Sequence, residues 1–444
     1  MTEASFPWAG RQLHFVGIGG AGMSGLARIS LELGAVVSGS DRAAGVVLQE
    51  LGGLGADVMV GHQADNLPEG AELVYSSAVG EENSERSAAA ARGQTQMHRS
   101  ELLGELTQLK PTIAVTGTHG KTTTSAMVLA ALEGAGLRPG WVIGAQLAGG
   151  RPSAGWGSSP WLVVEADESD RSLLALHTEV AVVTNCELDH HATYSSLDDL
   201  RATLSEFLGG AQSAVVWDQP DLVSLVPSGT AVYPYDALAP GSENGRAEFT
   251  WRGVSIRLAV PGLHNGVNAS GALEAASLTG VDQSGLISGI EAFRGTARRF
   301  EELGVSSAGA RLVDDYAHHP TEVAATIQAA RSLNPKRVVL AFQPHLFSRT
   351  QELADEFGSA LAGADVVLVS DIYPAREVAE DFPGVDAGML VSAAGTLSSG
   401  SRATASGDLA QTQAALEAEM QAGDLVILMG AGDIGTLGRR LVGS

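Results

Sequence analysis

Short apolar runs that end at turns containing glycine recur along the whole chain and alternate with helical stretches. Residues 13–16, 113–115 and 180–183 are runs of this kind, and residues 23–33 and 122–132 have the length and periodicity of helices. Fully apolar runs of this length are typical of strands that are buried on both faces, as they are in parallel sheets. Strands that alternate with helices build such sheets through βαβ units. The pattern therefore predicts an α/β fold with mainly parallel sheets.

The apolar runs fall into three groups, which predict three domains. The first group ends before Lys110-Pro111 and predicts a domain over residues 1–107. The second group predicts a central domain over residues 108–303, and the third predicts a domain over residues 304–444. A length of 444 residues agrees with this division, because domains commonly contain about 100–200 residues.

Three segments outside the apolar runs also carry local predictions. Residues 251–260 alternate between apolar and polar side chains, as an antiparallel strand with one exposed face does. Pro320 suits the first turn of a helix, where its missing N–H costs nothing. The polar residues 397–406 predict a loop.

The composition excludes several classes of protein. The formal net charge of -24 repels nucleic acid phosphates, so any phosphorylated ligand must be held by loop amides, a few basic side chains and metal ions. Cys186 is the one cysteine, so a disulfide within the chain is impossible. Residues 1–10 lack the features of a signal peptide, and no apolar stretch reaches the roughly 18 residues that span a bilayer. We expect a cytoplasmic protein without membrane insertion that binds no nucleic acid.

The first glycine-rich segment is Gly17-Ile18-Gly19-Gly20-Ala21-Gly22, which fits the G-x-G-x-x-G pattern between a predicted strand and a predicted helix. Asp41 ends the next predicted strand. Glycines at these positions let the backbone approach a diphosphate, and the helix N-terminus supplies amide donors. The pattern alone is compatible with a nicotinamide dehydrogenase, with a UDP-sugar enzyme, or with a glycine turn needed only for packing.

The second glycine-rich segment, Thr116-Gly117-Thr118-His119-Gly120-Lys121-Thr122-Thr123, also follows a strand and opens a helix. It is shorter than the usual G-x-x-x-x-G-K-[ST] pattern, because Val115 stands where the first glycine would be. It has the parts of a phosphate-binding loop: amides that cradle phosphates, Lys121 for the outer phosphates, and Thr122 for Mg²⁺. Two phosphate sites in successive domains favour an enzyme that binds ATP and a separate nucleotide-linked substrate over a dehydrogenase.

Acidic and histidine side chains follow two further strands of the central domain. Glu165-Ala166-Asp167-Glu168-Ser169-Asp170 comes directly after a predicted strand, where enzymes with phosphate-binding loops place the acid that takes the metal. A solvated acidic loop is the plain alternative. Asp189-His190-His191 follows residues 180–183, which makes His190 a candidate metal or substrate contact. For Cys186 we expect a packed thiol and no nucleophilic role, because no nearby residue in the sequence lowers its pKa.

Polar clusters also follow the later predicted strands. Because open α/β sheets bind ligands at the carboxyl ends of their strands, these clusters are further candidates for ligand contacts. They are His264-Asn265-Gly266-Val267-Asn268-Ala269, Arg298-Arg299-Phe300-Glu301, Asp314-Asp315-Tyr316-Ala317-His318-His319-Pro320, Phe342-Gln343-Pro344-His345, Ser348-Arg349-Thr350 and Tyr373-Pro374-Ala375-Arg376-Glu377.

This set of motifs, in this order, resembles the Mur ligase family. The likeness extends from Gly17 to Ile434 and rests mainly on the motifs at residues 17–25, 116–124, 165–170 and 314–320. The resemblance implies a Rossmann-like domain that binds a UDP substrate, a central ATPase domain of the phosphate-loop type, and a C-terminal Rossmann-like domain that closes over the site. It also implies an ATP-dependent ligase that joins L-alanine to UDP-N-acetylmuramate through an acyl-phosphate. We expect a monomer or a homodimer.

The resemblance also assigns roles to individual residues. The UDP diphosphate would contact Gly17, Gly19, Gly20 and Gly22, with Asp41, Ser76 and Ser77 nearby. ATP would contact Gly117, Thr118, His119, Gly120, Lys121, Thr122, Thr123, Asn268, Arg299, Asp315, His345 and Arg349. The metal, Mg²⁺ or its substitute Mn²⁺, would be held by Thr122, Glu165 and His190. Lys121, Glu165 and His190 would be the catalytic residues, and Arg376 would hold the amino-acid carboxylate.

Some features of the sequence depart from the family. Phe347 stands where a tyrosine is common, and the arginines for the amino-acid carboxylate are not evident, with Arg376 as the candidate. In several sister ligases a carbamylated lysine helps position Mg²⁺. Here Lys110, Lys121 and Lys336 are the only lysines, and Lys121 is assigned to phosphate, so we expect activity without bicarbonate.

Three alternative functions stay open at this point. The nearest is a recycling ligase that adds an intact murein tripeptide to the same UDP-sugar, although the Gly-Met-Ser-Gly run at residues 22–25 favours the L-alanine ligase. The other two are an NAD(P)-dependent oxidoreductase and a nucleotide-binding regulator without turnover. Lys121, Glu165 and His190 together argue against both of these, because neither class needs a phosphate-binding lysine beside metal-ligating side chains.

Overall fold

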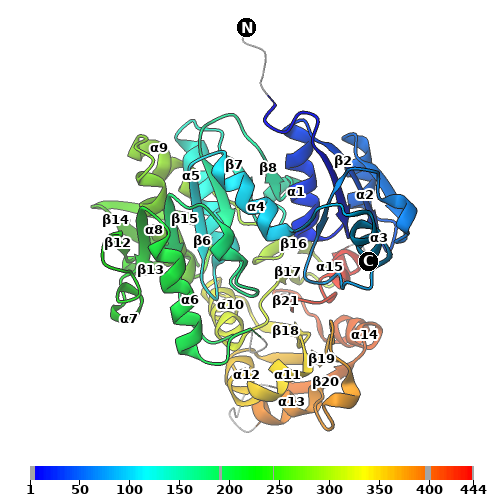
Figure 1. Cartoon of the computed structure of the whole chain (residues 1–444). Coiled ribbons are helices and arrows are strands. Elements are labelled where there is room, and N and C mark those ends of the chain that lie inside the picture. The colour runs from blue at the N-terminus through cyan, green and yellow to red at the C-terminus, as the bar shows by residue number, and fades with distance from the viewer. Residues whose placement is uncertain (1–5, 190–192, 244, 396–401, 443–444) are drawn as a thin grey trace. The chain divides into compact units, whose positions relative to one another are not determined.

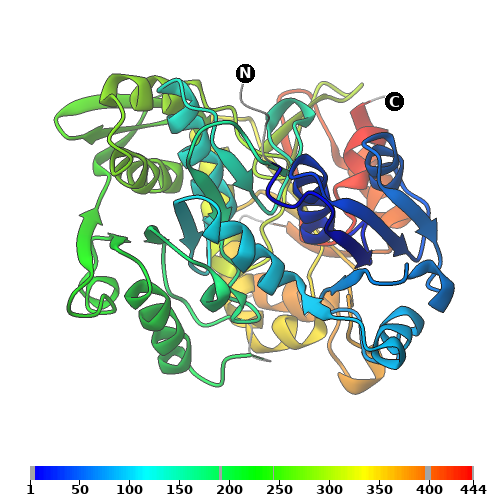
Figure 2. The ribbon, with the colours of Figure 1, turned by 45° about the horizontal axis from the view of Figure 1, so that its top comes forward.

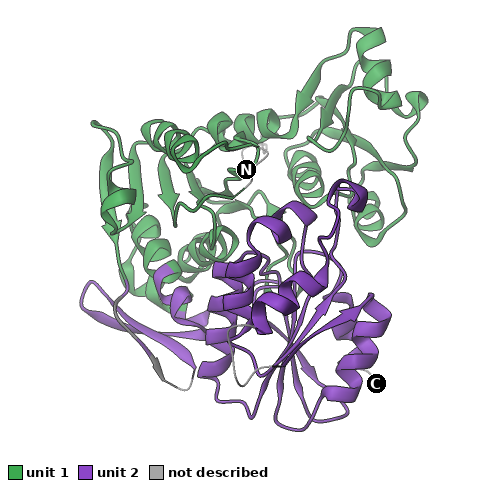
Figure 3. Ribbon diagram, turned by 90° about the horizontal axis from the view of Figure 1, so that it is seen from below, with its two compact units in different colours: residues 1–236, 268–290 green, residues 237–267, 291–444 purple. Residues whose placement is uncertain are grey.

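The structure is a computed structural model that describes residues 6–189, 193–243, 245–395 and 402–442 (Figures 1 and 2). The chain forms two compact units (Figure 3): unit 1 is residues 1–236 with 268–290, and unit 2 is residues 237–267 with 291–444. Parallel strands predominate in the large sheets of both units. The predicted fold class is therefore confirmed, whereas the bounds of the three predicted domains stay predictions.

The first sheet of unit 1 has five parallel strands in the order β3-β2-β1-β4-β5. The strands are β1 (Gln12–Val16), β2 (Val36–Asp41), β3 (Asp57–Val60), β4 (Glu72–Tyr75) and β5 (Gln96–His98). The helices are α1 (Ala21–Glu32), α2 (Val46–Gly53), α3 (Ser84–Arg92) and α4 (Arg99–Gln108). Leu13 and Phe15 pack with α1, α2 and α4 on one face, and Val16 packs with α3 on the other. The chain order reverses between β1 and β4, which is where such sheets bind ligands.

The second sheet of unit 1 has the order β12-β11-β10-β6-β9-β7-β8, and only β7 and β8 pair antiparallel. Its strands are β6 (Thr112–Thr116), β7 (Gly140–Val142), β8 (Ala154–Gly155), β9 (Leu162–Glu165), β10 (Val180–Val183), β11 (Ser213–Trp217) and β12 (Ala231–Tyr235). The helices nearby in sequence are α5 (Lys121–Gly134), α6 (Leu197–Gly209), α7 (Pro220–Val223), α8 (Leu263–Ser277) and α9 (Gln283–Ala292). Because β6 lies between β9 and β10, the loops after these three strands are neighbours.

The hairpin β7–β8 joins the two sheets of unit 1. A side chain at Gly25 of α1 would lie 2.9 Å from the Ala154 Cβ, so the helix and hairpin pack in close contact. The Trp156 N–H donates to the Glu32 carboxylate at 2.7 Å, which ties the end of α1 to the same hairpin. The glycine at position 25, part of the Gly-Met-Ser-Gly run, thus has a packing role within this unit.

Unit 2 begins with a three-stranded antiparallel sheet of β13 (Leu238–Glu243), β14 (Arg246–Trp251) and β15 (Val254–Pro261). Along β14 the side chains of Ala247, Phe249 and Trp251 are buried, and along β15 those of Ile256 and Leu258 are buried. The alternation predicted an antiparallel strand with one exposed face, and the structure confirms it.

The large sheet of unit 2 has the order β16-β17-β21-β18-β19-β20, parallel except for the edge strand β16. Its strands are β16 (Glu301–Val305), β17 (Arg311–Asp315), β18 (Val338–Phe342), β19 (Val366–Ser370), β20 (Arg402–Gly407) and β21 (Leu425–Met429). Its helices are α10 (Pro320–Ser332), α11 (Phe347–Glu352), α12 (Ala354–Leu361), α13 (Ala387–Gly395), α14 (Leu409–Glu419) and α15 (Thr436–Val442). Pro320 opens α10 as predicted, and buried residues cover both faces of the sheet.

One local prediction in unit 2 was wrong. Residues 397–406 were predicted to form a loop, but Arg402–Gly407 is the strand β20, which pairs with β19. Its residues are exposed or half-buried, because β20 is an edge strand and has no apolar run. Residues 396–401 lie outside the described part of the chain. Among the helices that the structure describes, none is long and apolar enough to cross a membrane.

Candidate active site

The second glycine-rich loop, residues 117–120, lies between β6 and α5, as predicted. Gly117 and Gly120 have φ values of +127° and +80°, a backbone conformation that favours glycine. A Cβ at Gly117 would overlap the Thr184 hydroxyl, and a Cβ at Gly120 would lie 2.8 Å from the Asn268 Oδ1. The loop is therefore in close contact with the segment after β10 and with α8, and the predicted contact residue Asn268 lies beside it.

The segment after β10 holds this loop in place. The carbonyl of His119 accepts hydrogen bonds from the Thr184 hydroxyl at 2.6 Å and from the Asn185 side-chain amide at 2.9 Å. The His119 N–H donates to Asn185 Oδ1 at 2.8 Å. The Thr118 hydroxyl donates to the Glu187 carbonyl at 2.8 Å. Thr118 and His119 thus have their backbone positions set by a neighbouring strand, which the sequence did not indicate.

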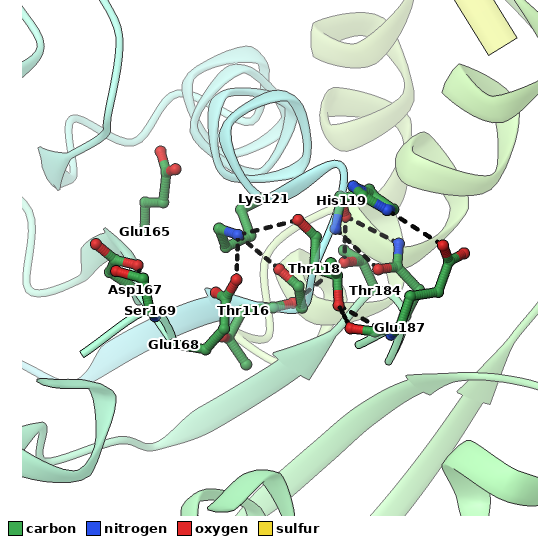
Figure 4. Close-up of polar contacts among 12 residues, drawn as sticks. Thr116, Thr118, His119, Lys121, Glu165, Asp167, Glu168, Ser169, Thr184 and Glu187 are labelled. Atoms are coloured by element: carbon green, nitrogen blue, oxygen red, sulfur yellow. Dashed lines mark hydrogen bonds and ion pairs between the residues drawn. The ribbon is translucent and has the colours of Figure 1, made fainter. Parts of the chain in front are cut away.

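Lys121 extends along the inner side of the loop (Figure 4). Its Nζ donates to the carbonyls of Gly117 at 2.8 Å and Thr118 at 3.2 Å, and it forms an ion pair with the buried Glu168 at 2.8 Å. Burial alone would lower the pKa of Lys121, but the negative charge of Glu168 raises it above its ordinary value. The ammonium group is therefore charged and located where a phosphate-binding loop needs it.

Two predicted metal ligands lie side by side. The Thr122 hydroxyl donates to Glu165 Oε1 at 2.8 Å, and the Gly144 N–H donates to Glu165 Oε2 at 2.6 Å. Thr123 is half-buried in the same first turn of α5. A hydroxyl and a carboxylate in contact suit a divalent cation that takes oxygen ligands. His190, the third predicted ligand, lies outside the described residues.

The acidic loop, defined here as residues 165–170, also reaches the first sheet. The Arg99 guanidinium at the start of α4 lies 3.4 Å from Asp167 and 3.3 Å from Asp170. The Ser77 hydroxyl donates to Asp170 at 3.2 Å. Burial would raise the pKa of Asp167, but the charge of Lys121 holds it below its ordinary value. One loop therefore contacts Lys121 and Thr122 on one side and Ser77 and Arg99 on the other.

Arg99 was not among the site residues predicted from the sequence. A Cβ at Gly22 would lie 3.1 Å from the Arg99 NH1, so this guanidinium lies against the first turn of α1 as well as the acidic loop. The available signal was its position directly after β5, at the edge of the sheet where the other candidate residues lie.

The first glycine loop lies between β1 and α1, also as predicted. The N–H groups of Gly17 and Ile18 donate to the Ser40 carbonyl at 2.8 and 3.0 Å. The Gly19 N–H donates to the Asp41 carboxylate at 2.9 Å. Gly20 caps α1 without a side-chain hydrogen bond, which leaves the first-turn amides oriented toward the loop. Ser76 and Ser77 follow β4, the strand next to β1, and so lie at the same edge of the sheet.

In unit 2, Asp315 stabilises the segment before β16. Its Oδ2 accepts the Phe300 N–H at 2.8 Å and its Oδ1 accepts the Ala317 N–H at 2.8 Å. Burial raises the pKa of Asp315 to about 6, although the nearby Arg299 opposes this shift. Arg298 and Phe300, on either side of Arg299, have φ values of +57° and +50°. Asp315 therefore supports a backbone conformation that non-glycine residues rarely adopt.

A series of rings connects the other predicted residues of unit 2. The Arg299 guanidinium lies 5.1 Å from the Tyr316 ring, and the rings of Tyr316 and His318 are 5.2 Å apart. The His318 and His345 rings are 6.0 Å apart, and the Arg349 NH1 lies 3.4 Å from the His345 Nδ1. Arg299, Asp315, His345 and Arg349 thus lie in one region of unit 2.

The predicted amino-acid ligand Arg376 is not part of this series. It is exposed in the loop after β19, between Ala375, with a φ of +51°, and Glu377. Glu377 accepts a 2.5 Å hydrogen bond from the Ser348 hydroxyl at the start of α11. Tyr373, which belongs to one of the polar clusters predicted from the sequence, lies in the same loop and stacks on His345 with ring centroids 5.7 Å apart.

The chain is similar to proteins of known function over nearly its full length. A family described as the Mur ligase family, catalytic domain, matches residues 12–111, and one described as Mur ligase, glutamate ligase domain, matches residues 298–432. A UDP-N-acetylmuramate–L-alanine ligase of Streptomyces griseus is 40% identical over 98% of this chain and 97% of its own length. The ligase of the same name from Chlorobium phaeovibrioides is 42% identical over 96% of this chain and 95% of its own length.

Solved structures give the same picture. The crystal structure of a UDP-N-acetylmuramate–alanine ligase from Thermotoga maritima matches 97% of this chain and 98% of its own with a TM-score of 0.82 and 27% identity. A murein peptide ligase from Psychrobacter arcticus matches 98% of each chain with a TM-score of 0.72 and 21% identity. The second likeness shows a common fold only.

Proposed function

Because the chain belongs to the Mur ligase family, we propose that it is an ATP-dependent ligase that joins L-alanine to the carboxylate of UDP-N-acetylmuramate through an acyl-phosphate. One observation of the structure carries this proposal. The acidic loop contacts Lys121 and Thr122 of the phosphate-binding loop, and it also contacts Ser77 and Arg99 next to the first glycine loop. Two connected loops suit a reaction between two phosphate-bearing substrates.

The first glycine loop is the proposed site of the UDP diphosphate. Gly17, Gly19, Gly20 and Gly22 would let the diphosphate approach the amides at the start of α1, and Asp41, Ser76 and Ser77 would lie around it. Arg99 lies against Gly22, so it would contribute a positive charge at the same place. The local positive charge is needed, because the net charge of the chain is -24.

The second loop is the proposed ATP site. Gly117, Thr118, His119 and Gly120 would cradle the phosphates, and Thr123 would add a hydroxyl. Lys121 would exchange its contact with Glu168 for the transferring phosphoryl group, since both are anionic partners for one ammonium. Asn268, Arg299, Asp315, His345 and Arg349 are the other proposed contacts of ATP.

Thr122 and Glu165 fit a metal ion through their adjacent oxygen atoms, with His190 as the proposed third ligand. Mg²⁺, when bound, neutralises charge on the phosphoryl group that is transferred to the muramate carboxylate. A histidine ligand also suits Mn²⁺. When the L-alanine amine attacks the acyl-phosphate and phosphate leaves, His190 or a metal-bound group is the proposed base that takes the proton of the amine. Arg376 is the proposed contact of the L-alanine carboxylate.

A murein tripeptide recycling ligase is the second candidate, because its fold is the same. The names of the relatives at 40% and 42% identity support the L-alanine ligase over it. An NAD(P)-dependent oxidoreductase or a regulator without turnover would not need the Lys121–Glu168 pair and the Thr122–Glu165 pair of the second loop. A cytoplasmic location and a monomeric or homodimeric state stay predictions.

The decisive experiment measures phosphate release from ATP with the purified chain, UDP-N-acetylmuramate and Mg²⁺, while the amino component is varied. We expect release with L-alanine, and little release with glycine, D-alanine, the murein tripeptide or no amino component. Release with the tripeptide in place of L-alanine would identify the recycling ligase. Oxidation of NADH or NADPH without ATP use would overturn the ligase altogether.

A further inference from the structure

The first sheet contains a buried group of polar side chains that the proposed mechanism does not use. We call it the Glu85 network; its members are His14, Ser38, Ser40, His62, Asn66 and Glu85. Glu85 lies on α3 and its side chain is fully buried, as is that of His14 on β1. His14, Ser38 and Ser40 lie on the face of the sheet that α3 covers, because they alternate along β1 and β2 with Leu13, Phe15 and Val37, which pack on the α1 side.

Glu85 is the centre of this network. Its Oε2 accepts the Ser40 hydroxyl at 2.6 Å, and its Oε1 accepts the Asn66 side-chain amide at 2.7 Å and the Gln63 N–H at 3.3 Å. The His62 Nδ1 lies 2.8 Å from the Ser40 Oγ and 3.5 Å from the Glu85 carboxylate. The hydroxyl oxygen of Ser40 is therefore held by two partners, Glu85 and His62.

A buried carboxylate is costly unless it is paired and hydrogen-bonded. Burial would raise the pKa of Glu85, but the His14 ring 3.6 Å away and the hydrogen bonds from Ser40 and Asn66 lower it to about 2. The carboxylate is ionised at neutral pH and its negative charge is a fixed anchor for Ser40. Apolar side chains of similar size would fill this space without such a cost, so the network needs a reason other than packing.

Ser40 connects the network to the first glycine loop. Its carbonyl accepts the N–H groups of both Gly17 and Ile18, at 2.8 and 3.0 Å. The next residue, Asp41, accepts the N–H of Gly19 at 2.9 Å. The end of β2 thus contacts three successive N–H groups of the loop, and the position of Ser40 decides where these contacts lie.

We propose that Glu85 is a positioning residue for the UDP substrate: by fixing Ser40, it holds the glycine loop in the conformation that presents the first-turn amides of α1 to the diphosphate. It does not touch the substrate itself. This inference rests on the proposed function of the loop as the UDP site. It assigns a role in substrate affinity to residues on the far side of the sheet from α1.

The test uses the full-length chain with the variants Glu85→Gln and Ser40→Ala, with Glu81→Gln as control. Glu81 is exposed and precedes the same helix. The measurements are the calorimetric Kd for UDP-N-acetylmuramate, the KM values for ATP and L-alanine, kcat and the Tm. We expect Glu85→Gln to raise the Kd and KM for the UDP-sugar about 10-fold or more, because preorganisation of a loop is lost. The KM values for ATP and L-alanine and kcat should stay within about twofold, because the second loop is unchanged.

The double variant gives a sharper result. If Glu85 acts through Ser40, the effects of Glu85→Gln and Ser40→Ala on the Kd should not add, because both remove the same link. Unchanged Kd values for the UDP-sugar in both single variants would overturn the inference. Weaker binding of all substrates to a similar extent, accompanied by a lower Tm, would also overturn it, because a merely structural role predicts that result. Should Glu85→Gln fail to fold, Ser40→Ala and the Glu81→Gln control decide by the same readouts.

The failure of this inference can be distinguished from the failure of the proposed function. If the wild-type chain binds no UDP-N-acetylmuramate and shows no turnover with it, the proposed function is wrong, and the inference fails with it. If the wild-type chain binds and turns over this substrate but the variants bind it with the wild-type Kd, the inference alone is wrong.

Discussion

The two glycine loops of unit 1 have the same local plan but different surroundings. Each loop follows the middle strand of its sheet, β1 or β6, and leads into a helix. In the first loop, Gly19 donates to Asp41, and the fixed acid Glu85 lies in the core behind it. In the second loop, Lys121 lies beside the loop itself and pairs with Glu168, an acid of the neighbouring loop. The first loop can hold an anion through its amides, and the second loop can also direct the positive charge of Lys121 at the anion.

The difference shows that the strands beside a glycine loop decide its chemistry. β1 has β2 as a neighbour, and β2 contributes Ser40 and Asp41, which contact backbone N–H groups. β6 has β9 as a neighbour, and β9 leads into Glu165 and Glu168, which contact the side chains of Thr122 and Lys121. The first arrangement is suited to binding and the second to phosphoryl transfer. Four predictions test this comparison.

The largest effect is expected for Lys121→Ala. A positive group that is directed at developing charge contributes roughly 3–4 kcal/mol to a transition state, so kcat should fall about 10²–10³-fold or more. The Kd for UDP-N-acetylmuramate should stay within about twofold, because the first loop contains no lysine. Steady-state phosphate release and calorimetry measure both. Lys336→Ala removes an exposed lysine of unit 2 and is the control. Turnover near that of the wild type in Lys121→Ala would remove the distinction between the two loops.

The converse change is Gly19→Val in the first loop. A Cβ at Gly19 would lie 2.8 Å from both the Asp41 carboxylate and the Leu48 Cδ1, so the larger side chain must displace the loop. We expect the Kd for UDP-N-acetylmuramate to rise about 100-fold, equivalent to roughly 3 kcal/mol, while ATP still binds. Gly53→Ala, in the open part of α2, is the control, because a Cβ there meets nothing within 4 Å. Tight binding of NADH by the wild type without binding of the UDP-sugar would instead revive the oxidoreductase.

The pH dependence of stability should show that Glu85, the acid behind the first loop, is ionised in the folded protein. Because the folded-state pKa of Glu85 is lowered from 4.5 to about 2, its contribution is present above about pH 4.5 and is lost as the pH falls through 2. The Glu85→Gln variant should therefore have a lower Tm than the wild type at pH 7. This deficit should shrink toward pH 3, because the difference in the free energy of unfolding between the two proteins falls by roughly 2 kcal/mol. Thermal unfolding at a series of pH values measures it, and a deficit that is constant from pH 7 to pH 3 would contradict an ionised Glu85.

The smallest expected effect concerns bicarbonate. Carbamate formation needs a neutral amine, but Lys121 pairs with Glu168, which raises its pKa, and a carbamate would reverse its charge. The two other lysines are Lys110 and Lys336, and none lies between Thr122 and Pro335. We therefore expect phosphate release to be the same with and without added bicarbonate, also at mildly acidic pH. Stimulation by bicarbonate would show that the metal site differs from this proposal. A carbamate on any lysine, seen as a mass increase of about 44 Da from one added CO₂, would show the same.

Much of the candidate site could be predicted because its motifs are local. The segments 17–22 and 116–123 each contain a turn and the start of the following helix, and both were confirmed as connections between a strand and that helix. The antiparallel strand near residue 251 and the helix at Pro320 were likewise predicted from their own residues. The roles of the site residues stay predictions, and His190 lies outside the described residues.

Other parts could not be predicted, because they depend on partners that are distant in sequence. Lys121 and Glu168 are 47 residues apart, and Ser40 and Glu85 are 45 residues apart. Arg99 showed no motif of its own, and its significance follows from contacts with the acidic loop. The strand β20 was missed for the same reason. It has no apolar run like that of a central strand, and it forms a strand through its pairing with β19.

The α/β class, the two glycine loops and the types of side chain that follow each strand could be predicted from the sequence, because hydrophobic periodicity and turn geometry depend on neighbouring residues. The order of the strands in each sheet became known from the fold alone. That order placed β9 and β10 on either side of β6, and so placed Glu165, Glu168 and Thr184 around one loop. It also placed Glu85 behind Ser40. The physical reason is that strand order is set by the burial of entire faces of the sheet, which no single segment of the sequence contains.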